Sequence, residues 1–142
     1  MCLYQLDLDL HNVCVRDKIC ELVGGAHVMT FMSNMKPFDQ VLRLWDYYMT
    51  HGFHLNILAI VALLFLMRPT LLAGSKDGWK FIRESKLDAA SIIAVVERVK
   101  GRISVSLMEL LKAHLYDPAS FKLISNFQGH LINDETDDFS PR

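Results

Sequence analysis

The fold is decided by residues 36–68, which read KPFDQVLRLWDYYMTHGFHLNILAIVALLFLMR. Pro37 is tolerated in a first helical turn and Gly52 is a typical helix stop, so the first half of this stretch predicts a helix over residues 38–50. Trp45 is expected to fill the core, with Arg43 and Asp46 paired on the opposite face. The predicted core stripe has helical spacing and consists of Phe38, Val41, Leu42, Trp45, Tyr48 and Met49.

Nearly every residue from 55 to 67 is apolar, which predicts a second helix buried on all sides at the centre of the fold. The continuous apolar run, 57–67, has 11 residues and is shorter than the roughly 20 that a membrane span needs. Pro69 follows directly after Arg68 and is expected to end or kink this helix. No membrane span is therefore predicted.

Two capped helices are predicted farther along the chain. Asp88 has the position of an N-cap for residues 89–100, and Gly101 that of a stop, although the β-branched residues between them leave a strand as the alternative. Ser106 and Glu109 have the spacing of a capping box before a helix over 107–115.

Weaker helical patterns cover residues 10–22 and 26–35, and Pro118 is expected to open a short helix that ends near Gln128. The chain is thus predicted to be all-α, an array of about six to seven helices over residues 1–128. Residues 129–142 form an acidic tail that we expect to be disordered.

The composition excludes several classes of protein. The 142 residues carry 15 Lys and Arg against 16 Asp and Glu, a net charge of −1 that gives no general attraction to nucleic acid. Three cysteines, an odd number without regular spacing, argue for a reducing compartment rather than a disulfide framework. We therefore expect a cytoplasmic protein.

No motif for catalysis or for a cofactor stands out. Ser33 and Lys36 match S-x-x-K, but the partner motifs of that enzyme class are absent and a polar helix end is the better interpretation. The zinc-ligand residue types occur with an unsuitable C-x5-C spacing, so we expect small hydrophobes and surface histidines and keep a metal site only as the less favoured alternative. These residues are His11, Cys14, Cys20 and His27.

Residues 36–68 also resemble the C-terminal half of the TBC domain, the helical fold of Rab-type GTPase-activating proteins. The resemblance lies in the Pro37-Phe38 turn, the Arg-Leu-Trp-Asp sequence at 43–46, the glycine break and the apolar helix that follows. It extends loosely over 5–116. The segment 52–58 is similar to the checkpoint branch of that family, which acts in mitotic exit. The matching signature residues, expected to have structural or partner-contact roles, are Arg43, Trp45, Asp46, Gly52, His54 and Asn56.

The resemblance implies a regulator of a small Rab- or Ras-like GTPase. Its partners would be that GTPase and either a second subunit or the missing N-terminal half of the domain, at a spindle pole or centrosome if the checkpoint branch is right. Activating members supply an arginine in I-x-x-D-x-x-R and a glutamine in Y-x-Q. Neither motif occurs here, so the chain as given is expected to be non-catalytic.

Two sets of alternatives stay open. A truncated sequence, a short paralogue and a split protein would each explain a resemblance to half of a domain. The competing function is a free-standing helical interaction module unrelated to GTPases. If the half-domain folds alone, its N-terminal edge is expected to expose apolar surface.

Overall fold

The computed structural model describes residues 1–74 and 78–120, and in that part of the chain the protein is all-α, as predicted. Six of the helices have seven or more residues, which agrees with the predicted six to seven. No helix in these two ranges is both long enough and apolar enough to cross a membrane. The elements are α1 (Cys2–Leu6), α2 (Leu8–Arg16), the π-helical turn η1 (Cys20–Gly24), α3 (Gly25–Thr30), α4 (Phe38–His51), α5 (Leu55–Leu66), α6 (Arg68–Leu72), α7 (Gly78–Glu84), α8 (Ala89–Lys100) and α9 (Val105–Ala113).

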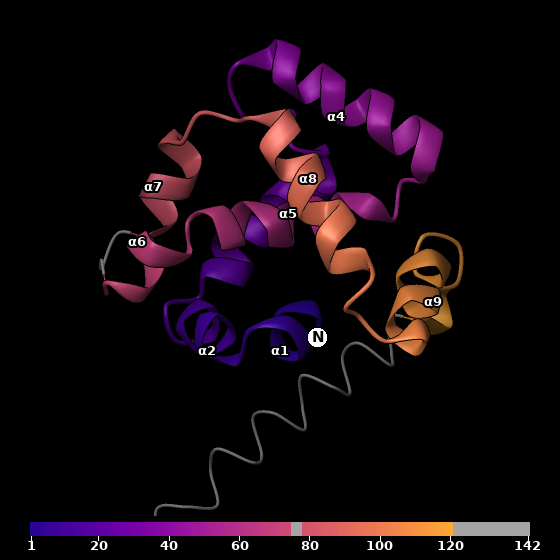
Figure 1. Cartoon of the computed structure of the whole chain (residues 1–142), viewed down its shortest axis with the longest axis horizontal. Helices are drawn as coiled ribbons and strands as arrows, with labels where there is room; N and C mark the ends of the chain where they lie inside the picture. Colours follow the sequence, from indigo (N-terminus) through magenta and orange to yellow (C-terminus); the bar gives the residue numbers. More distant parts are fainter. Residues whose placement is uncertain (75–77, 121–142) are drawn as a thin grey trace, which may run out of the picture.

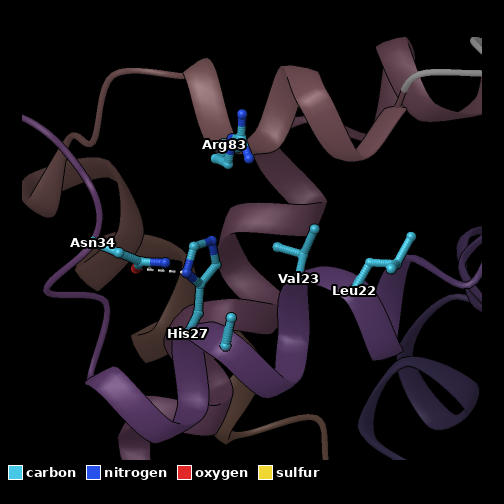
Figure 2. Close-up of a pocket in the computed structure, with 6 residues that line it drawn as sticks. Leu22, Val23, His27, Asn34 and Arg83 are labelled. Carbon is cyan, nitrogen blue, oxygen red and sulfur yellow. Dashed lines mark hydrogen bonds between the residues drawn. The ribbon is translucent and has the colours of Figure 1, made fainter.

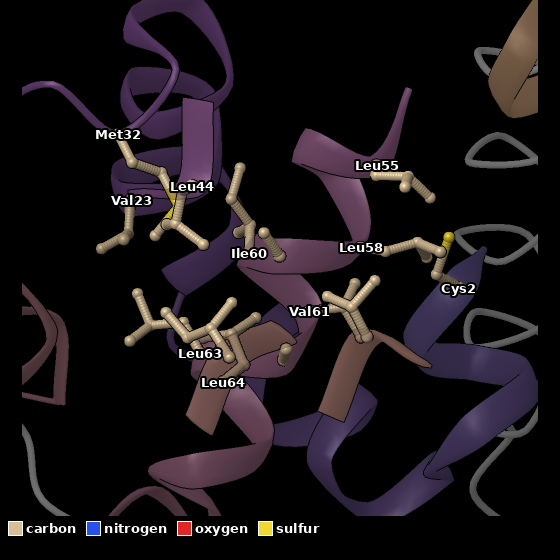
Figure 3. Packing of buried hydrophobic residues seen from close by; sticks show 14 of the residues in the cluster. Cys2, Val23, Met32, Leu44, Leu55, Leu58, Ile60, Val61, Leu63 and Leu64 are labelled. Atoms are coloured by element: carbon tan, nitrogen blue, oxygen red, sulfur yellow. The ribbon is translucent and has the colours of Figure 1, made fainter. Parts of the chain in front are cut away.

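Helix α5 is the centre of the fold, as its sequence predicts. Figure 1 shows it in the middle of the array, and it packs most extensively against α8. Leu58, Ala59 and Ala62 are fully buried, because neighbours surround this helix on every side. Figure 3 shows side chains of α5 that point toward α1 on one side of the helix and toward α4 on the other, with Leu58 beside Cys2 and Ile60 beside Leu44.

Helix α4 has the predicted boundaries but buries a different face from the predicted one. Val41, Leu44 and Tyr48 are fully buried, whereas three members of the predicted stripe are exposed and Trp45 is half-buried. The exposed members are Phe38, Leu42 and Met49. The prediction that the whole stripe, with Trp45, enters the core is therefore wrong. The buried residues also have helical spacing, and the contacts of α4 with α8 and α5 select them.

The two predicted N-caps have different outcomes. Asp88 caps α8, since its Oδ1 accepts from the amides of Ala90 at 3.1 Å and Ser91 at 3.4 Å. The predicted cap at Ser106 is wrong, because α9 begins two residues earlier and its cap is Ser104. The Ser104 amide donates to the side chain of Gln5 at 3.1 Å, a contact across 99 residues that no local pattern contains.

The weaker predicted helices are shorter than their patterns. The first pattern, over 10–22, ends as α2 at Arg16, and Lys18 then takes a left-handed φ of 53°. The second, over 26–35, ends at Thr30, where Phe31 has a φ of 50°. A residue with a left-handed backbone conformation ends a helix. Neither residue is a glycine, so no local sequence signal marks these helix ends. The predicted helix from Pro118 is described only as far as Ser120, and the acidic tail lies outside the described residues.

A charged pair joins α2 to α6. Asp7 caps α2 by accepting from the amide of Leu10 at 3.0 Å, and it also accepts from Arg68 Nε at 2.5 Å. The hydrogen bond from Arg68 is the main cause that lowers the pKa of Asp7. This contact fixes the start of α6 against the start of α2.

Candidate partner-binding surface

The outer face of α4 carries an apolar stripe of three exposed side chains and the half-buried Trp45. It is made of Phe38, Leu42, Trp45 and Met49, which follow one another at helical spacing along the solvent side. Leu42 is 44% exposed and Met49 is 63% exposed. In Figure 1, α4 runs along the outer edge of the array, away from α1 and α2. We call these four residues the outer face of α4.

Next to this face lies an open cavity of about 300 Å3. Phe31 and Phe53, from the segments before and after α4, line it together with Trp45 and Met49. The rings of Phe31 and Phe53 meet edge to face, with their centroids 5.8 Å apart. The cavity walls are therefore wholly apolar, and aromatic and methionine side chains of this kind are enriched in protein–protein interfaces.

Trp45 is held at the border between core and surface. Its indole Nε1 donates a hydrogen bond to the carbonyl oxygen of Phe31 at 2.8 Å, and its ring meets Phe38 edge to face at 6.0 Å. The side chain is half-buried. Trp45 consequently presents one side of its indole to the cavity in a fixed orientation, which costs little conformational entropy when a partner binds.

Arg43 and Asp46 are exposed beside the outer face, and the pair expected between them does not form. The positive charge of Arg43 lies instead near Asp88, at the start of α8. The pKa of Asp88 is lowered chiefly by hydrogen bonds from Ser91, and Arg43 adds to this shift. The charges of Arg43 and Asp46 therefore lie at the edge of the apolar outer face of α4.

Gly52 and His54 form the turn that joins α4 to α5. The φ of Gly52 is +116°, and a Cβ atom there would lie 2.6 Å from two atoms of the His54 ring. A glycine is therefore required at this position. Burial is the main cause that lowers the pKa of His54, and the charges of Lys112 and His114 add to it.

Asn56 joins α5 to α3 from a buried position. Its Nδ2 donates to the carbonyl oxygen of Val28 at 3.1 Å, and its Oδ1 is buried without a partner among the described residues. Gly52, His54 and Asn56 therefore have structural surroundings, whereas Arg43, Trp45 and Asp46 lie at the surface. Their part in binding stays a prediction.

The histidines and cysteines that the sequence offered as zinc-ligand types differ in part in burial from what we expected. His11 and His27 are both buried, so the expectation of surface histidines is wrong. His27 is compatible with burial because its Nδ1 bonds to Asn34 Oδ1 at 2.8 Å. Cys14 is buried, as expected of a small hydrophobe, whereas Cys20 is exposed. In residues 1–74 and 78–120, no three His, Cys, Asp or Glu side chains converge as metal ligands would.

The N-terminal helices expose some apolar side chains, and the expected apolar edge stays a prediction. Leu8 and Val15 of α2 and Leu22 of η1 are each about half exposed or more.

Sequence reasoning did not find the contribution of Phe31 and Phe53 to the cavity, because both lie in turns outside the helical stripe. The sequence alone showed only that both residues are aromatic, one before the start of α4 and the other directly after the glycine break.

Comparison with known proteins gives three relatives from the control of cell division. The chain is 35% identical over 98 residues to mitotic check point protein BUB2 of Saccharomyces cerevisiae. The aligned residues cover 69% of this chain and 32% of the yeast protein. It is 32% identical over 109 residues to a Dictyostelium discoideum protein provisionally assigned as BUB2, covering 77% of the chain and 30% of that protein. The chain is a homologue of these checkpoint proteins over the aligned residues.

The third relative is cell division control protein 16 of Schizosaccharomyces pombe, 24% identical over 124 residues, which cover 87% of the chain and 42% of that protein. The chain spans about a third of the length of the two BUB2 proteins and 42% of the third relative. No family model and no solved structure matches it.

Proposed function

We propose that this chain is part of a TBC-type regulator of a small Rab- or Ras-like GTPase in a cell-cycle checkpoint. In this proposal residues 1–128 form a partial TBC-like domain, and the outer face of α4 contacts the GTPase. The homology to checkpoint proteins supports the family. The observation that supports the contact is the largely exposed apolar stripe on the helix that carries the Arg-Leu-Trp-Asp sequence.

The chemistry of the outer face suits a partner that binds and leaves. Trp45 and the two phenylalanines of the cavity provide a rigid apolar centre, which is where binding energy concentrates in protein interfaces. Arg43 and Asp46 stand exposed at the rim, where charges contribute more to orientation and association rate than to affinity. An apolar centre within a charged rim is the usual anatomy of a reversible interface.

The catalytic groups are proposed to come from outside this chain. An arginine that neutralises charge on the transferring phosphoryl group accelerates hydrolysis by about 10³–10⁵. Residues 1–142 contain neither the arginine motif nor the glutamine motif of the family. The N-terminal half of the domain or a second subunit would supply them, and this chain would contribute helical framework and partner contact without hydrolysing activity of its own.

The proposal is tested with the purified 142-residue chain and a panel of Rab- and Ras-like GTPases, each loaded with a non-hydrolysable GTP analogue or with GDP. We expect at least one GTPase to bind about tenfold more tightly in its GTP form, a difference of about 1.4 kcal/mol. In a single-turnover assay the same GTPase should hydrolyse GTP at its intrinsic rate when the chain is added.

Other results would contradict the proposal. Binding that is equal in the two nucleotide states would support the interaction module unrelated to GTPases, and an absence of binding across the panel would exclude the GTPase contact. Faster hydrolysis would contradict the non-catalytic role. A fluorescently tagged chain that fails to concentrate at the spindle pole or centrosome in mitosis would remove that localisation from the proposal.

A further inference from the structure

The acidic tail contains one short segment that combines negative charge with an aromatic side chain. Four of the five residues 134–138 are acidic, and Phe139 follows them directly. No other residue from 133 to 142 has a large apolar side chain. In protein interfaces a buried ring supplies the anchor and neighbouring charges supply orientation, so residues 134–139 have the composition of a docking segment.

The cavity beside α4 suits an aromatic ring. Its lining consists of the rings of Phe31, Trp45 and Phe53 and the thioether of Met49, and it is wholly apolar. Aromatic rings pack edge to face against one another, and a thioether sulfur also makes favourable contacts with them. A cavity of about 150 Å3 is enough to hold benzene, and this one measures about 300 Å3.

Positive charge borders this cavity at the α4–α5 turn. His54 directly follows Phe53, and its pKa is lowered first by burial and then by cationic residues at the ends of α8 and α9, while Glu109 opposes the shift. Figure 1 shows α9 on the same side of the array as the end of α4. Most charges acting on this turn are thus positive, which favours a carboxylate beside it. The cationic residues are Lys112, His114 and Lys100.

The two lysines have capacity for a further carboxylate. Lys100 Nζ pairs with Glu97 Oε1 at 2.7 Å, and Lys112 Nζ pairs with Glu109 Oε1 at 2.8 Å. Each pair joins residues three apart on one helix, a kind of surface ion pair that contributes little to stability. An ammonium group has three donors, so each lysine can donate to a second acceptor while its pair persists.

The chain is long enough to bring residues 134–139 to the cavity. The described part of the chain reaches Ser120, shortly after α9, and Phe139 is 19 residues farther along. A chain of that length spans at most roughly 65 Å. A compact domain of this size has a radius of gyration of only about 13 Å. Length therefore does not prevent the contact.

A second pocket, of about 260 Å3, offers a poorer match. It lies between α7 and the η1–α3 segment, and Figure 2 shows its aliphatic side chains Leu22 and Val23, with His27 bonded to Asn34 and Arg83 on the facing helix. This lining has one guanidinium but none of the phenylalanine or tryptophan rings of the cavity beside α4. Docking in this second pocket is the competing outcome of the test.

We propose that residues 134–139 bind back onto the domain, with the ring of Phe139 in the cavity beside α4 and the acidic side chains against Lys100 and Lys112. The docked segment then covers the part of the outer face of α4 that lines the cavity, and it competes with a partner for that face. This regulatory consequence rests on the proposed function. The docking itself does not, and it is tested without a GTPase.

The test compares nuclear magnetic resonance spectra of the ¹⁵N-labelled 142-residue chain and of Phe139→Ala. We expect the substitution to shift the indole signal of Trp45 and the amide signal of Phe53, and to leave the amides of Val23 and Asn34 unchanged. An unshifted indole signal, or shifts at Val23 and Asn34 instead, would overturn the proposal. The difference should also persist on dilution, because a difference that disappears would mean docking onto a second copy.

A synthetic peptide of residues 130–142, added to the Phe139→Ala chain, tests the ring and the charges separately. It should return the Trp45 signal in a saturable way to its position in the unchanged chain, and more weakly as salt is raised. The same peptide with alanine at 139 should not bind. A peptide with all four acids changed to amides should bind about tenfold more weakly or worse, and equal binding would overturn the role of charge. The four changes are Asp134→Asn, Glu135→Gln, Asp137→Asn and Asp138→Asn.

Two matched phenylalanines test the place of docking. Phe53 lines the cavity and is 46% exposed, whereas Phe81 lies on α7 and is 49% exposed. In the Phe139→Ala chain, Phe53→Ala should weaken binding of the peptide about tenfold, and Phe81→Ala should leave it unchanged, with folding of both checked by circular dichroism. Equal binding by the two variants would overturn the cavity as the docking site.

Discussion

Replacing Gly52 by alanine tests the α4–α5 turn. The backbone at Gly52 has a φ of +116° and a ψ of 138°, a conformation that side-chain-bearing residues adopt at a cost of about 1–3 kcal/mol. The new Cβ would also lie 2.6 Å from the ring of His54, and moving that ring off its preferred rotamer adds about 1 kcal/mol. We therefore expect Gly52→Ala to lower the free energy of unfolding by about 2–4 kcal/mol.

The assay is equilibrium unfolding in urea, followed by far-ultraviolet circular dichroism. With an m-value of about 2 kcal/mol/M, the unfolding midpoint should fall by about 1–2 M. The matched control is Gly101→Ala. Gly101 has an ordinary φ of −78°, and no atom lies within 4 Å of a Cβ there, so alanine should stabilise the protein by about 0.4–1 kcal/mol.

A double-mutant cycle separates the two contributions at Gly52. In a His54→Ala background the contact with the ring is absent, so Gly52→Ala should cost about 1 kcal/mol less while the backbone cost stays. The reasoning would be refuted if Gly52→Ala changed the unfolding free energy by less than about 0.5 kcal/mol, the range of a neutral surface substitution. Equal effects at Gly52 and Gly101 would refute it as well.

Three further predictions concern the core, the charged pair and a helix cap. Leu44→Ala should destabilise the protein by about 2–5 kcal/mol and Trp45→Ala by about 1–2 kcal/mol, and the reverse order in urea unfolding would show that the indole is buried after all. The pKa of Asp7 is lowered, so its stabilising effect is complete above about pH 3.9 and is lost as the pH falls; Asp7→Asn should flatten the fall of the urea midpoint between about pH 5 and pH 2, and an unchanged slope would argue against the pair. Ser104→Ala should cost about 1 kcal/mol in thermal unfolding, while Ser106→Ala, at the cap predicted from sequence, should change stability by less than about 0.5 kcal/mol.

Local signals predicted the elements whose ends they mark. The Pro37 and Gly52 boundaries located α4, and Asp88 located α8, because a cap or a stop depends only on the residues beside it. The continuous apolar run located α5 and its central position, since a helix that is apolar all round must be enclosed. Periodicity failed for α4 because two overlapping stripes share Val41 and Tyr48, and only tertiary contact decides between them.

Long-range contacts account for what sequence could not predict. The cap at Ser104 depends on Gln5, which is 99 residues away. In the candidate site, the Arg-Leu-Trp-Asp resemblance identified Trp45, but the cavity also needs Phe31 and Phe53 from turns on either side of α4. No spacing rule relates these residues to the helical stripe, so the cavity is a property of the folded chain.

The GTPase contact of the outer face of α4 is tested most directly by two matched leucines. Leu42 lies on that face and is 44% exposed, while Leu66, at the end of α5, is 45% exposed. The measurement is the dissociation constant of the GTP-bound GTPase for Leu42→Asp and Leu66→Asp, with folding checked by circular dichroism. We predict that Leu42→Asp weakens binding about tenfold or more and that Leu66→Asp binds like the unchanged chain. Equal affinities of the two variants would contradict the account.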